Sequence, residues 1–262
     1  METSFSEKRK ATILDMLEKN ENLSVIELSR TFQVSPVTIR RDLELLEQQG
    51  IIERFYGGAK IKGASGEDSL SNNKLILQKE AIAQNAAKMV SDGDTLFINT
   101  SSTAIRILNY ITASHVTVIT NNAKALQAKL IANDLSIVLT GGELRFPKNS
   151  MTGEFALNNL NKVTVDKCFL GCAGITVEEG LTTNILQEAS INETMLRRTN
   201  GTRVIVADHT KIGLHQNFIS GNPDLFDYLI TDTGVDDKEI AKFQARGITC
   251  VQVPVGKANL QK

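Results

Sequence analysis

Two adjacent arginines stand near the start of a predicted helix, beside small hydrogen-bonding side chains. Ser35 is a favourable helix N-cap, and it precedes Val37, Thr38, Arg40 and Arg41. At 100° per residue, Val37, Thr38 and Arg41 share one side of the helix. Arg41 can bond a guanine edge, Thr38 a base or a phosphate, and Val37 a thymine methyl group. Arg40 lies on the flank, where a phosphate is the nearer partner. This spacing predicts a helix that enters the major groove of DNA.

A short hairpin is predicted directly after this helix. Gly57 and Gly58 interrupt a β-prone segment, residues 51–62, as glycines do in a hairpin turn. Arg54 and Lys60 fall on its two strands, where they could straddle a phosphate backbone. The hairpin would form a wing beside the helix.

Three short helices must position these residues. They are predicted to begin near Ser4, at Ser24 and at Ser35, and a glutamate follows each of the first two serines at capping-box spacing. The third helix turns inward the side chains of Ile39, Leu43 and Leu46. An ordinary three-helix module with incidental arginines is the alternative, but it does not predict a capped third helix followed at once by a hairpin. We therefore expect a winged helix-turn-helix over residues 6–61.

The overall charge of this segment does not predict DNA binding. Residues 1–60 contain nine Lys or Arg and ten Asp or Glu, and the whole chain has a net charge of −1. Contacts with DNA must therefore come from where the basic residues lie. The chain has no Trp and only 5% aromatic residues, which argues against an array of base-stacking side chains.

Residues 71–262 alternate short apolar runs with helical stretches. The predicted strands are 95–98, 116–119, 137–139, 168–170, 204–206, 228–230 and 248–251. The predicted helices lie near 75–91, 103–112, 123–132, 152–160, 187–199 and 236–246. Apolar runs with little alternation are typical of strands buried on both faces of a parallel sheet. We expect a mostly parallel α/β domain over residues 71–255, joined to the first domain by a small polar linker at 63–70.

Polar residues follow five of these predicted strands. They are Ser101, Ser102 and Thr103 after the first, Asn121 after the second, Gly141 and Gly142 after the third, Gly171 after the fourth, and His209 and Lys211 after the fifth. The carboxyl ends of parallel strands meet at a ligand crevice. Hydroxyl groups and N–H groups at a helix start bind anions, and Lys211 adds a positive charge. Each cluster alone fits a helix cap or a turn, but together they predict a site for a small phosphorylated ligand.

The N-terminal string Val34-Ser35-Pro36-Val37-Thr38-Ile39-Arg40-Arg41-Asp42-Leu43, followed by Gly57-Gly58-Ala59, resembles the DeoR family of bacterial transcriptional regulators. The resemblance continues over nearly the whole chain, through Ser101-Ser102-Thr103, Thr120-Asn121, Gly141-Gly142 and Asp208 to Gly213. It implies a second domain similar in fold to ribose-5-phosphate isomerase that binds phosphorylated sugars.

Three positions depart from the pattern of that family. Tyr56 replaces the usual His, Ser101 replaces a common Gly, and Asn99 replaces a common Asp. Compared with glycine, Ser101 leaves less space in its loop and adds a hydrogen-bond donor. Compared with aspartate, Asn99 removes a negative charge. Both changes could alter which sugar is accepted, so the ligand cannot be transferred from a relative.

These features together predict a sequence-specific transcriptional regulator. We expect a repressor of a carbohydrate-utilisation operon that is released by a phosphorylated sugar. Its partners would be double-stranded operator DNA and further copies of the chain in a dimer or tetramer, since operators are symmetric. The first alternative is a sugar-phosphate isomerase with a DNA-binding arm. Its only candidate base is Glu188, which fits a charge near a helix start equally well. The second alternative is a metabolite-binding protein with a vestigial arm.

Several other protein classes are excluded by the sequence. No apolar run approaches the roughly 18 residues that span a bilayer, and no signal peptide is evident, so we expect a cytoplasmic protein without membrane contacts. Cys168, Cys172 and Cys250 fit neither a disulfide framework nor a zinc site, and Cys168 reads as a small buried hydrophobe. There is no P-loop or dinucleotide fingerprint. We expect no metal and no cofactor.

Overall fold

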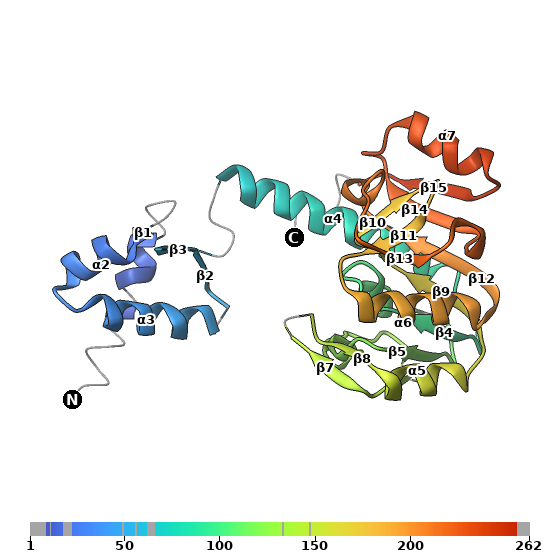
Figure 1. Cartoon of the computed structure of the whole chain (residues 1–262), viewed down its shortest axis with the longest axis horizontal. Helices are drawn as coiled ribbons and strands as arrows, with labels where there is room; N and C mark the ends of the chain where they lie inside the picture. Colours follow the sequence, from blue (N-terminus) through green and yellow to red (C-terminus); the bar gives the residue numbers. More distant parts are fainter. Residues whose placement is uncertain are drawn as a thin grey trace. The chain divides into compact units, whose positions relative to one another are not determined.

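The structure divides into two compact units. This computed structural model describes residues 9–10, 12–17, 23–48, 50–55, 57–61, 66–132, 134–146 and 148–255, without the side chains of 48, 60–61 and 66–73. One unit comprises residues 1–74 and the other residues 75–262 (Figure 1). Each has its own hydrophobic core. Among the described residues, no helix has the length and hydropathy to cross a membrane.

The first unit combines helices with a small antiparallel sheet. Residues 9–10 and 12–17 are helical and precede α2 (Val25–Phe32) and α3 (Pro36–Gln48). The strands β1 (Leu23–Ser24), β2 (Ile52–Phe55) and β3 (Gly58–Ile61) form a sheet in the order β1-β3-β2. This arrangement confirms the winged helix-turn-helix. The expected cap near Ser4 lies outside the described residues.

Local hydrogen bonds explain where α2 and α3 begin. Ser24 Oγ accepts from the backbone N–H of Glu27 at 3.1 Å, and the N–H of Ser24 donates to the Glu27 carboxylate at 2.7 Å. Ser35 Oγ accepts from the N–H of Thr38 at 3.2 Å. Gln33, with φ of 51°, reverses the chain between the two helices. Both predicted N-caps are therefore confirmed.

The inner face of α3 is apolar except for one charged residue. Ile39, Leu43 and Leu46 are at most 2% exposed and belong to the core of this unit, as expected. Asp42 is only 3% exposed. Arg9 Nε lies 2.5 Å from Asp42 Oδ2, so the charge of this buried carboxylate is compensated from the first helical segment.

A seven-stranded parallel sheet forms the centre of the second unit. Its strands are β4 (Thr95–Ile98), β5 (Thr117–Thr120), β6 (Ser136–Leu139), β9 (Val165–Leu170), β12 (Thr199–Val206), β14 (Tyr228–Asp232) and β15 (Thr249–Val253). Their spatial order is β15-β14-β12-β9-β4-β5-β6. The chain therefore runs outward from β4 to β6 and returns to the other side of β4 at β9. Open α/β sheets bind their ligands at such a reversal of strand order.

Helices cover both faces of this sheet (Figure 1). On one face are α4 (Gly66–Ala87) and the 3₁₀ helices η1 (Ala104–Asn109) and η2 (Ala123–Gln127); on the other are α5 (Glu154–Asn161), α6 (Leu186–Arg197) and α7 (Asp237–Ala245). Leu96 and Ile98 share one core cluster with Ile82 of α4. Phe97, between them, belongs to the other cluster with Met195 of α6. Both faces of β4 are thus buried, as its continuous apolar run predicts, whereas the edge strand β6 is partly exposed.

Smaller elements surround the carboxyl end of the sheet. A hairpin is formed by β7 (Glu143–Arg145) and β8 (Ser150–Thr152), and an antiparallel sheet by β10 (Gly174–Thr176), β11 (Gly180–Thr183) and β13 (Phe218–Gly221). The 3₁₀ helices η3 (His209–Lys211) and η4 (Pro223–Leu225) flank β13. The sequence did not predict these five strands, because polar residues and glycines interrupt them and leave no continuous apolar run.

Several predicted boundaries differ from the structure; β9 and β12, for instance, begin at Val165 and Thr199 instead of residues 168 and 204. α4 begins at Gly66 instead of residue 75, so its first turns occupy part of the predicted linker at 63–70. The helices expected at 103–112 and 123–132 are 3₁₀ helices of six and five residues. Gln, Lys and Ala favour helix through α4, whereas side-chain hydrogen bonds to neighbouring backbone fix the short turns.

Candidate functional site

The first turns of α3 carry an exposed polar face. Val37 is 70% exposed, and Arg40 and Arg41 are exposed as well. The hydroxyl oxygens of Ser35 and Thr38 lie 2.9 Å apart, so both are held at the start of the helix. The structure thus brings together these five residues that the sequence singled out.

Arg54 is placed differently from the expectation. Its Nε lies 3.2 Å from Glu47 Oε2, and its backbone N–H donates to Glu47 Oε1 at 3.2 Å. Its guanidinium also donates to the carbonyl of Arg40 at 3.4 Å. The side chain therefore ties β2 to α3 instead of reaching freely from the hairpin.

The hairpin glycines serve the geometry of the wing. Gly57 adopts a φ of 95°, which favours glycine. A Cβ at Gly58 would lie 2.5 Å from the carbonyl oxygen of Leu23. Lys60 pairs with Glu53 across the two strands, and its side chain lies outside the described part of the structure. The two glycines therefore allow β3 to approach β1 closely.

A cavity of about 310 Å³ opens at the carboxyl ends of β4, β9 and β12. This is where the strand order reverses. Of the predicted ligand residues, those that line it are Ser101, Ser102, Thr103, Gly171 and Lys211. Most of the predicted strand-end residues thus meet in one pocket.

Asn99 joins the ends of the two strands at the reversal. Its Oδ1 accepts from the N–H groups of Gly171 at 3.0 Å and of Ser101 at 3.3 Å. Its Nδ2 donates to the carbonyl of Gly171 at 2.8 Å and to Asn192 Oδ1 at 2.9 Å. A carboxylate could accept but not donate here. The amide at this position therefore fixes the pocket loops, a role that the sequence did not reveal.

Ser101 caps η1 with its side chain. Its Oγ accepts from the N–H groups of Thr103 at 3.1 Å and of Ala104 at 3.3 Å. The sequence predicts an anion at this helix start, where a ligand would compete with Ser101 for these two N–H groups. The hydroxyls of Ser102 and Thr103 remain at the pocket wall.

Gly171→Ala is expected to destabilise the second unit by about 1–3 kcal/mol. The added Cβ would lie 1.9 Å from Ser101 Oγ and 2.3 Å from Ser101 Cβ. Ser101→Gly removes both atoms, so the alanine should cost less than half as much in that background. Thermal or urea unfolding of the four proteins of this double-mutant cycle measures the coupling. If the changes in unfolding free energy of the two single variants add up to that of the double variant, the two residues are not energetically coupled.

Four lysines surround the pocket. Lys79 comes from α4, Lys124 from η2, Lys148 from the turn between β7 and β8, and Lys211 from η3. Lys148 Nζ lies 3.2 Å from Glu188 Oε2, and Lys79 Nζ lies 3.9 Å from Asp208 Oδ2. Within the described residues, neither Lys124 nor Lys211 forms an ion pair. The four lysine amines outnumber the two carboxylates that line the pocket, and this excess of positive charge favours an anionic ligand.

Lys79 shows the electrostatic state of the pocket most clearly. Burial lowers its pKa below the ordinary value; Asp208 opposes this shift, and the charges of Lys211 and Arg106 add to it. An anion bound between these cations would relieve their mutual repulsion. The sequence analysis indicated only Lys211, and tertiary packing alone brings Lys79 and Lys148 to the pocket.

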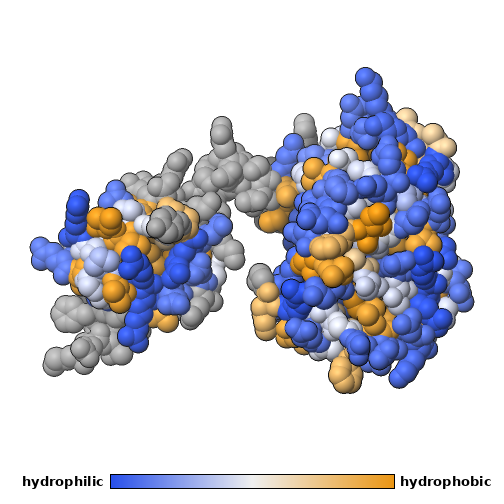
Figure 2. All heavy atoms as spheres, viewed as in Figure 1, coloured by the Kyte–Doolittle hydropathy of each residue, from blue (hydrophilic) through white to orange (hydrophobic). Residues whose placement is uncertain are grey.

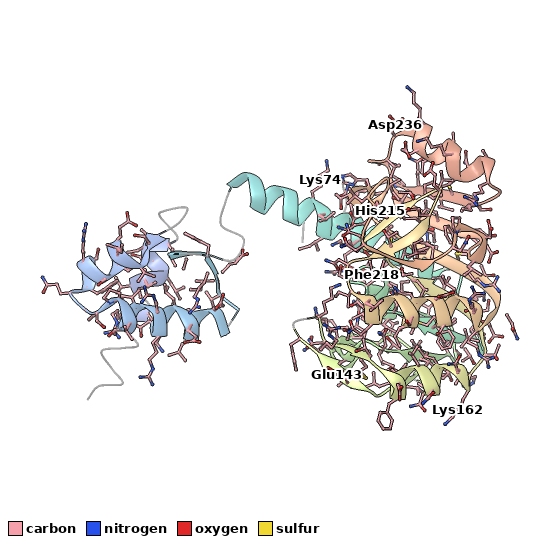
Figure 3. The ribbon with its side chains drawn as sticks, viewed as in Figure 1. Lys74, Glu143, Lys162, His215, Phe218 and Asp236 are labelled. Atoms are coloured by element: carbon pink, nitrogen blue, oxygen red, sulfur yellow. The ribbon has the colours of Figure 1, made fainter. Side chains whose placement is uncertain are left out.

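α4 is fastened to the end of the sheet beside this pocket. Gln78 Nε2 donates to Asp232 Oδ1 at 2.9 Å, and the N–H of His209 donates to Asp232 Oδ2 at 2.8 Å. His209 does not line the pocket, so the suggestion that it helps to bind ligand gains no support from its position. His115 is exposed, and His215, labelled in Figure 3, pairs with the partly exposed Glu179, so both lie at the surface.

Three predicted ligand residues lie outside the pocket lining. Asn121 Nδ2 donates to the carbonyl of Met151 at 3.2 Å. Gly141 and Gly142 have φ of 69° and 105° and form the turn into β7. A Cβ at Gly142 would lie 2.4 Å from the carbonyl oxygen of Thr152. These residues therefore position the β7–β8 hairpin, whose turn contributes Lys148 to the pocket lining.

Burial and pairing determine the state of the other reactive side chains. Burial raises the pKa of the Cys168 and Cys172 thiols to about 12, so both stay protonated near neutral pH. Cys168 is fully buried, which confirms its role as a small hydrophobe. Glu188 Oε2 is already paired with Lys148. The described chain holds no group of three side chains that suits a metal ion.

Comparison with protein families identifies both units. The family model "DeoR-like helix-turn-helix domain" matches residues 9–63, and the model "DeoR C terminal sensor domain" matches residues 75–233. The chain belongs to the DeoR family. This result confirms the resemblance drawn from the sequence and makes the protein a member of a family of transcriptional regulators.

Curated members of the DeoR family match almost end to end. The transcriptional regulator GolR of Listeria innocua is 33% identical over 249 residues, covering 93% of this chain and 97% of its own. GlpR of Haloferax volcanii is 30% identical over 246 residues, covering 93% and 96%. The glycerol-3-phosphate regulon repressor of Escherichia coli is 30% identical over 226 residues, covering 84% and 88%. Both units of this DeoR-family chain are thus shared with named regulators.

Solved structures match this DeoR-family chain only distantly. Ribose 5-phosphate isomerase A of Methanocaldococcus jannaschii aligns with a TM-score of 0.35 and 18% identity, covering 51% of this chain and 53% of its own. The delta subunit of eIF2B from Chaetomium thermophilum aligns with a TM-score of 0.41 and 19% identity, covering 62% and 59%. At this level of similarity the matches say nothing about activity.

Proposed function

We propose that this chain represses a carbohydrate-utilisation operon and leaves its operator when a phosphorylated sugar binds in the pocket. The main support is the cavity at the reversal of strand order, which is lined by four lysines and two carboxylates. The names of relatives support it: one is a glycerol-3-phosphate regulon repressor, and another is a putative aga operon transcriptional repressor of Escherichia coli. We infer that this chain is not an enzyme.

The exposed face of α3 would read the operator. Arg41 and Val37 would contact base edges in the major groove, while Arg40 would bind a phosphate. Thr38 is held by Ser35 at 2.9 Å and can donate to a base or a phosphate. The wing at Gly57 and Gly58, with Lys60, would approach the neighbouring backbone. Arg54 would support α3 more than it contacts DNA, because Glu47 holds it.

The pocket would bind the phosphate through hydroxyls and lysines. Ser102 and Thr103 line it beside Lys211, and Lys79 and Lys124 stand on the facing elements. Since Ser101 and Asn99 fix the loop, these groups are held in place before the ligand arrives. Such preorganisation lowers the entropic cost of binding.

Release from DNA would be a linkage effect. A ligand that binds one arrangement of the protein better than the DNA-bound arrangement lowers operator affinity by that difference. Symmetric operators require at least two copies of the chain, so we propose a homodimer or a tetramer. Apolar residues interrupt the hydrophilic surface of the second unit in several places (Figure 2). The exposed apolar side chains of this unit include Phe146, Phe155 and Leu186. Size-exclusion chromatography with light scattering tests this oligomer.

A ligand screen tests the proposed function directly. A sugar phosphate at about 100 times its Kd should stabilise the protein by about 2.7 kcal/mol and raise Tm by about 5–10 °C. The unphosphorylated sugar should have no such effect. The same compound should then weaken binding to a DNA duplex that the chain has selected from a random pool, at fixed salt. A panel that neither stabilises the protein nor releases the duplex would contradict the proposal.

The isomerase alternative is tested on the same protein. Catalysis would require a carboxylate base aimed at a substrate carbon, and Oε2 of Glu188 is engaged with Lys148 and Thr183. We expect no turnover of ribose 5-phosphate above the uncatalysed rate. Turnover that disappears in Glu188→Gln would establish the alternative.

A further inference from the structure

Glu188 carries a carboxylate oxygen without a partner. Its side chain is only 10% exposed and belongs to the pocket wall. Oε2 accepts from Lys148 Nζ at 3.2 Å and from the Thr183 hydroxyl at 3.3 Å. Oε1 is buried and has no hydrogen-bond partner among the described residues. A buried acceptor left this way is costly, so a donor from a ligand would be strongly favoured there.

A complementary donor lies one helical turn away. Asn192 follows Glu188 by four residues on α6, which places both on one side of the helix and on the pocket wall. Asn192 Oδ1 accepts from Asn99 at 2.9 Å, so its amide NH2 is the group left for a ligand. Together the two residues offer one acceptor and one donor.

This pair matches the chemistry of neighbouring hydroxyl groups. A hydroxyl both donates and accepts, so one hydroxyl can donate to Glu188 Oε1 while another accepts from Asn192. A phosphate has no proton donor to spare at neutral pH and would be repelled by the carboxylate. The hydroxyls and lysines described above suit the phosphate instead.

We propose that Glu188, assisted by Asn192, is the specificity-determining residue that recognises hydroxyl groups on the carbon chain of the effector. The effector is therefore a phosphorylated polyol or sugar with free hydroxyls, and not a phosphorylated acid or inorganic phosphate alone. This inference rests on the proposed function, because it assigns the sugar end of the same pocket. It also gives Glu188 a binding role in place of the catalytic one considered above.

The test compares Glu188→Gln with wild type. Affinities are measured by calorimetry for a panel of polyol and sugar phosphates of three to six carbons, and for inorganic phosphate. The glutamine keeps the size of the side chain, but its amide places either a donor or a weaker acceptor where the carboxylate oxygens of Glu188 lie. For the compounds that wild type binds, we expect affinity to fall about 10- to 100-fold, whereas weak binding of inorganic phosphate does not fall, because the change removes a negative charge from the pocket wall. Glu193→Gln on the exposed side of α6 is the matched control and should change neither.

The outcomes separate the inference from the proposed function. If wild type binds no compound of the panel, both fail. If it binds sugar phosphates and Glu188→Gln binds them equally well, only the inference fails. A merely structural role would lower Tm and weaken sugar phosphates and inorganic phosphate alike, which also overturns it. Glu188→Asp keeps the charge and withdraws the carboxylate by one methylene, so it should show the same selective loss if Glu188→Gln proves unstable.

Discussion

Lys211→Glu is expected to yield a protein that binds its operator normally but is not released by the sugar phosphate that releases wild type. Lys211 lines the pocket, and within the described residues no ion pair engages it. Losing one charge-assisted contact costs about 1.5–3 kcal/mol, and the new carboxylate adds repulsion. Effector affinity should therefore fall at least about 100-fold. Operator binding should survive, because Lys211 lies in the second unit.

The measurement is operator affinity with and without effector, at fixed salt because contacts with DNA phosphates are salt-dependent. Ser102→Asp should behave similarly, since it places a charge on the same wall. Lys162→Glu is the matched control, as this lysine lies after α5 and away from the pocket (Figure 3). If Lys211→Glu and Ser102→Asp release DNA at the wild-type effector concentration, the phosphate does not bind where we propose. Loss of DNA binding in both, with the fold intact, would point to tighter coupling between the units.

Arg41→Ala should weaken binding to the selected operator by about 1–3 kcal/mol and relax the preference at one base pair. Arg41 is exposed on the first turns of α3, on the same face as Val37, which is 70% exposed. A bidentate contact to guanine is the commonest base-specific contact that an arginine makes. Competition between the operator and single-base variants measures the effect.

Arg40→Ala is the matched comparison for Arg41. Arg40 lies on the flank of α3 and should bind a phosphate. Its loss should therefore weaken binding to all duplexes alike and reduce the dependence of affinity on salt. If Arg41→Ala leaves both affinity and base preference unchanged, Arg41 does not read the operator. Equal behaviour of the two variants would mean that both contact only the backbone.

Local chemistry made the first unit predictable from sequence. Ser24 with Glu27 and Ser35 with Pro36 are signals contained within a few residues, and the structure shows both caps. Arg54 was harder, because its partner Glu47 is seven residues away and belongs to another element. A basic residue on a predicted hairpin gives no sign of whether it faces DNA or a carboxylate on the preceding helix.

The strands of the second unit were predictable for a similar reason, but its pocket was only partly so. The apolar runs mark the strands and place Ser101 and Gly171 at their ends. Lys79 and Lys148 reach the same cavity from a helix and a hairpin turn, and only tertiary packing brings them there. Lys124 could have been found, since it follows the polar residues after β5 by one short turn.

The contact between Ser101 and Gly171 also constrains how this pocket can evolve. An alanine at 171 would place its Cβ 2.3 Å from that of Ser101, so the side chains exclude one another. A lineage with serine at 101 must first acquire glycine there before alanine at 171 becomes tolerable, and the reverse path passes through the same intermediate. The order of substitutions, and not only their identity, then determines which loops are accessible to descendants. This epistasis would keep the serine and glycine together wherever the capped loop is retained.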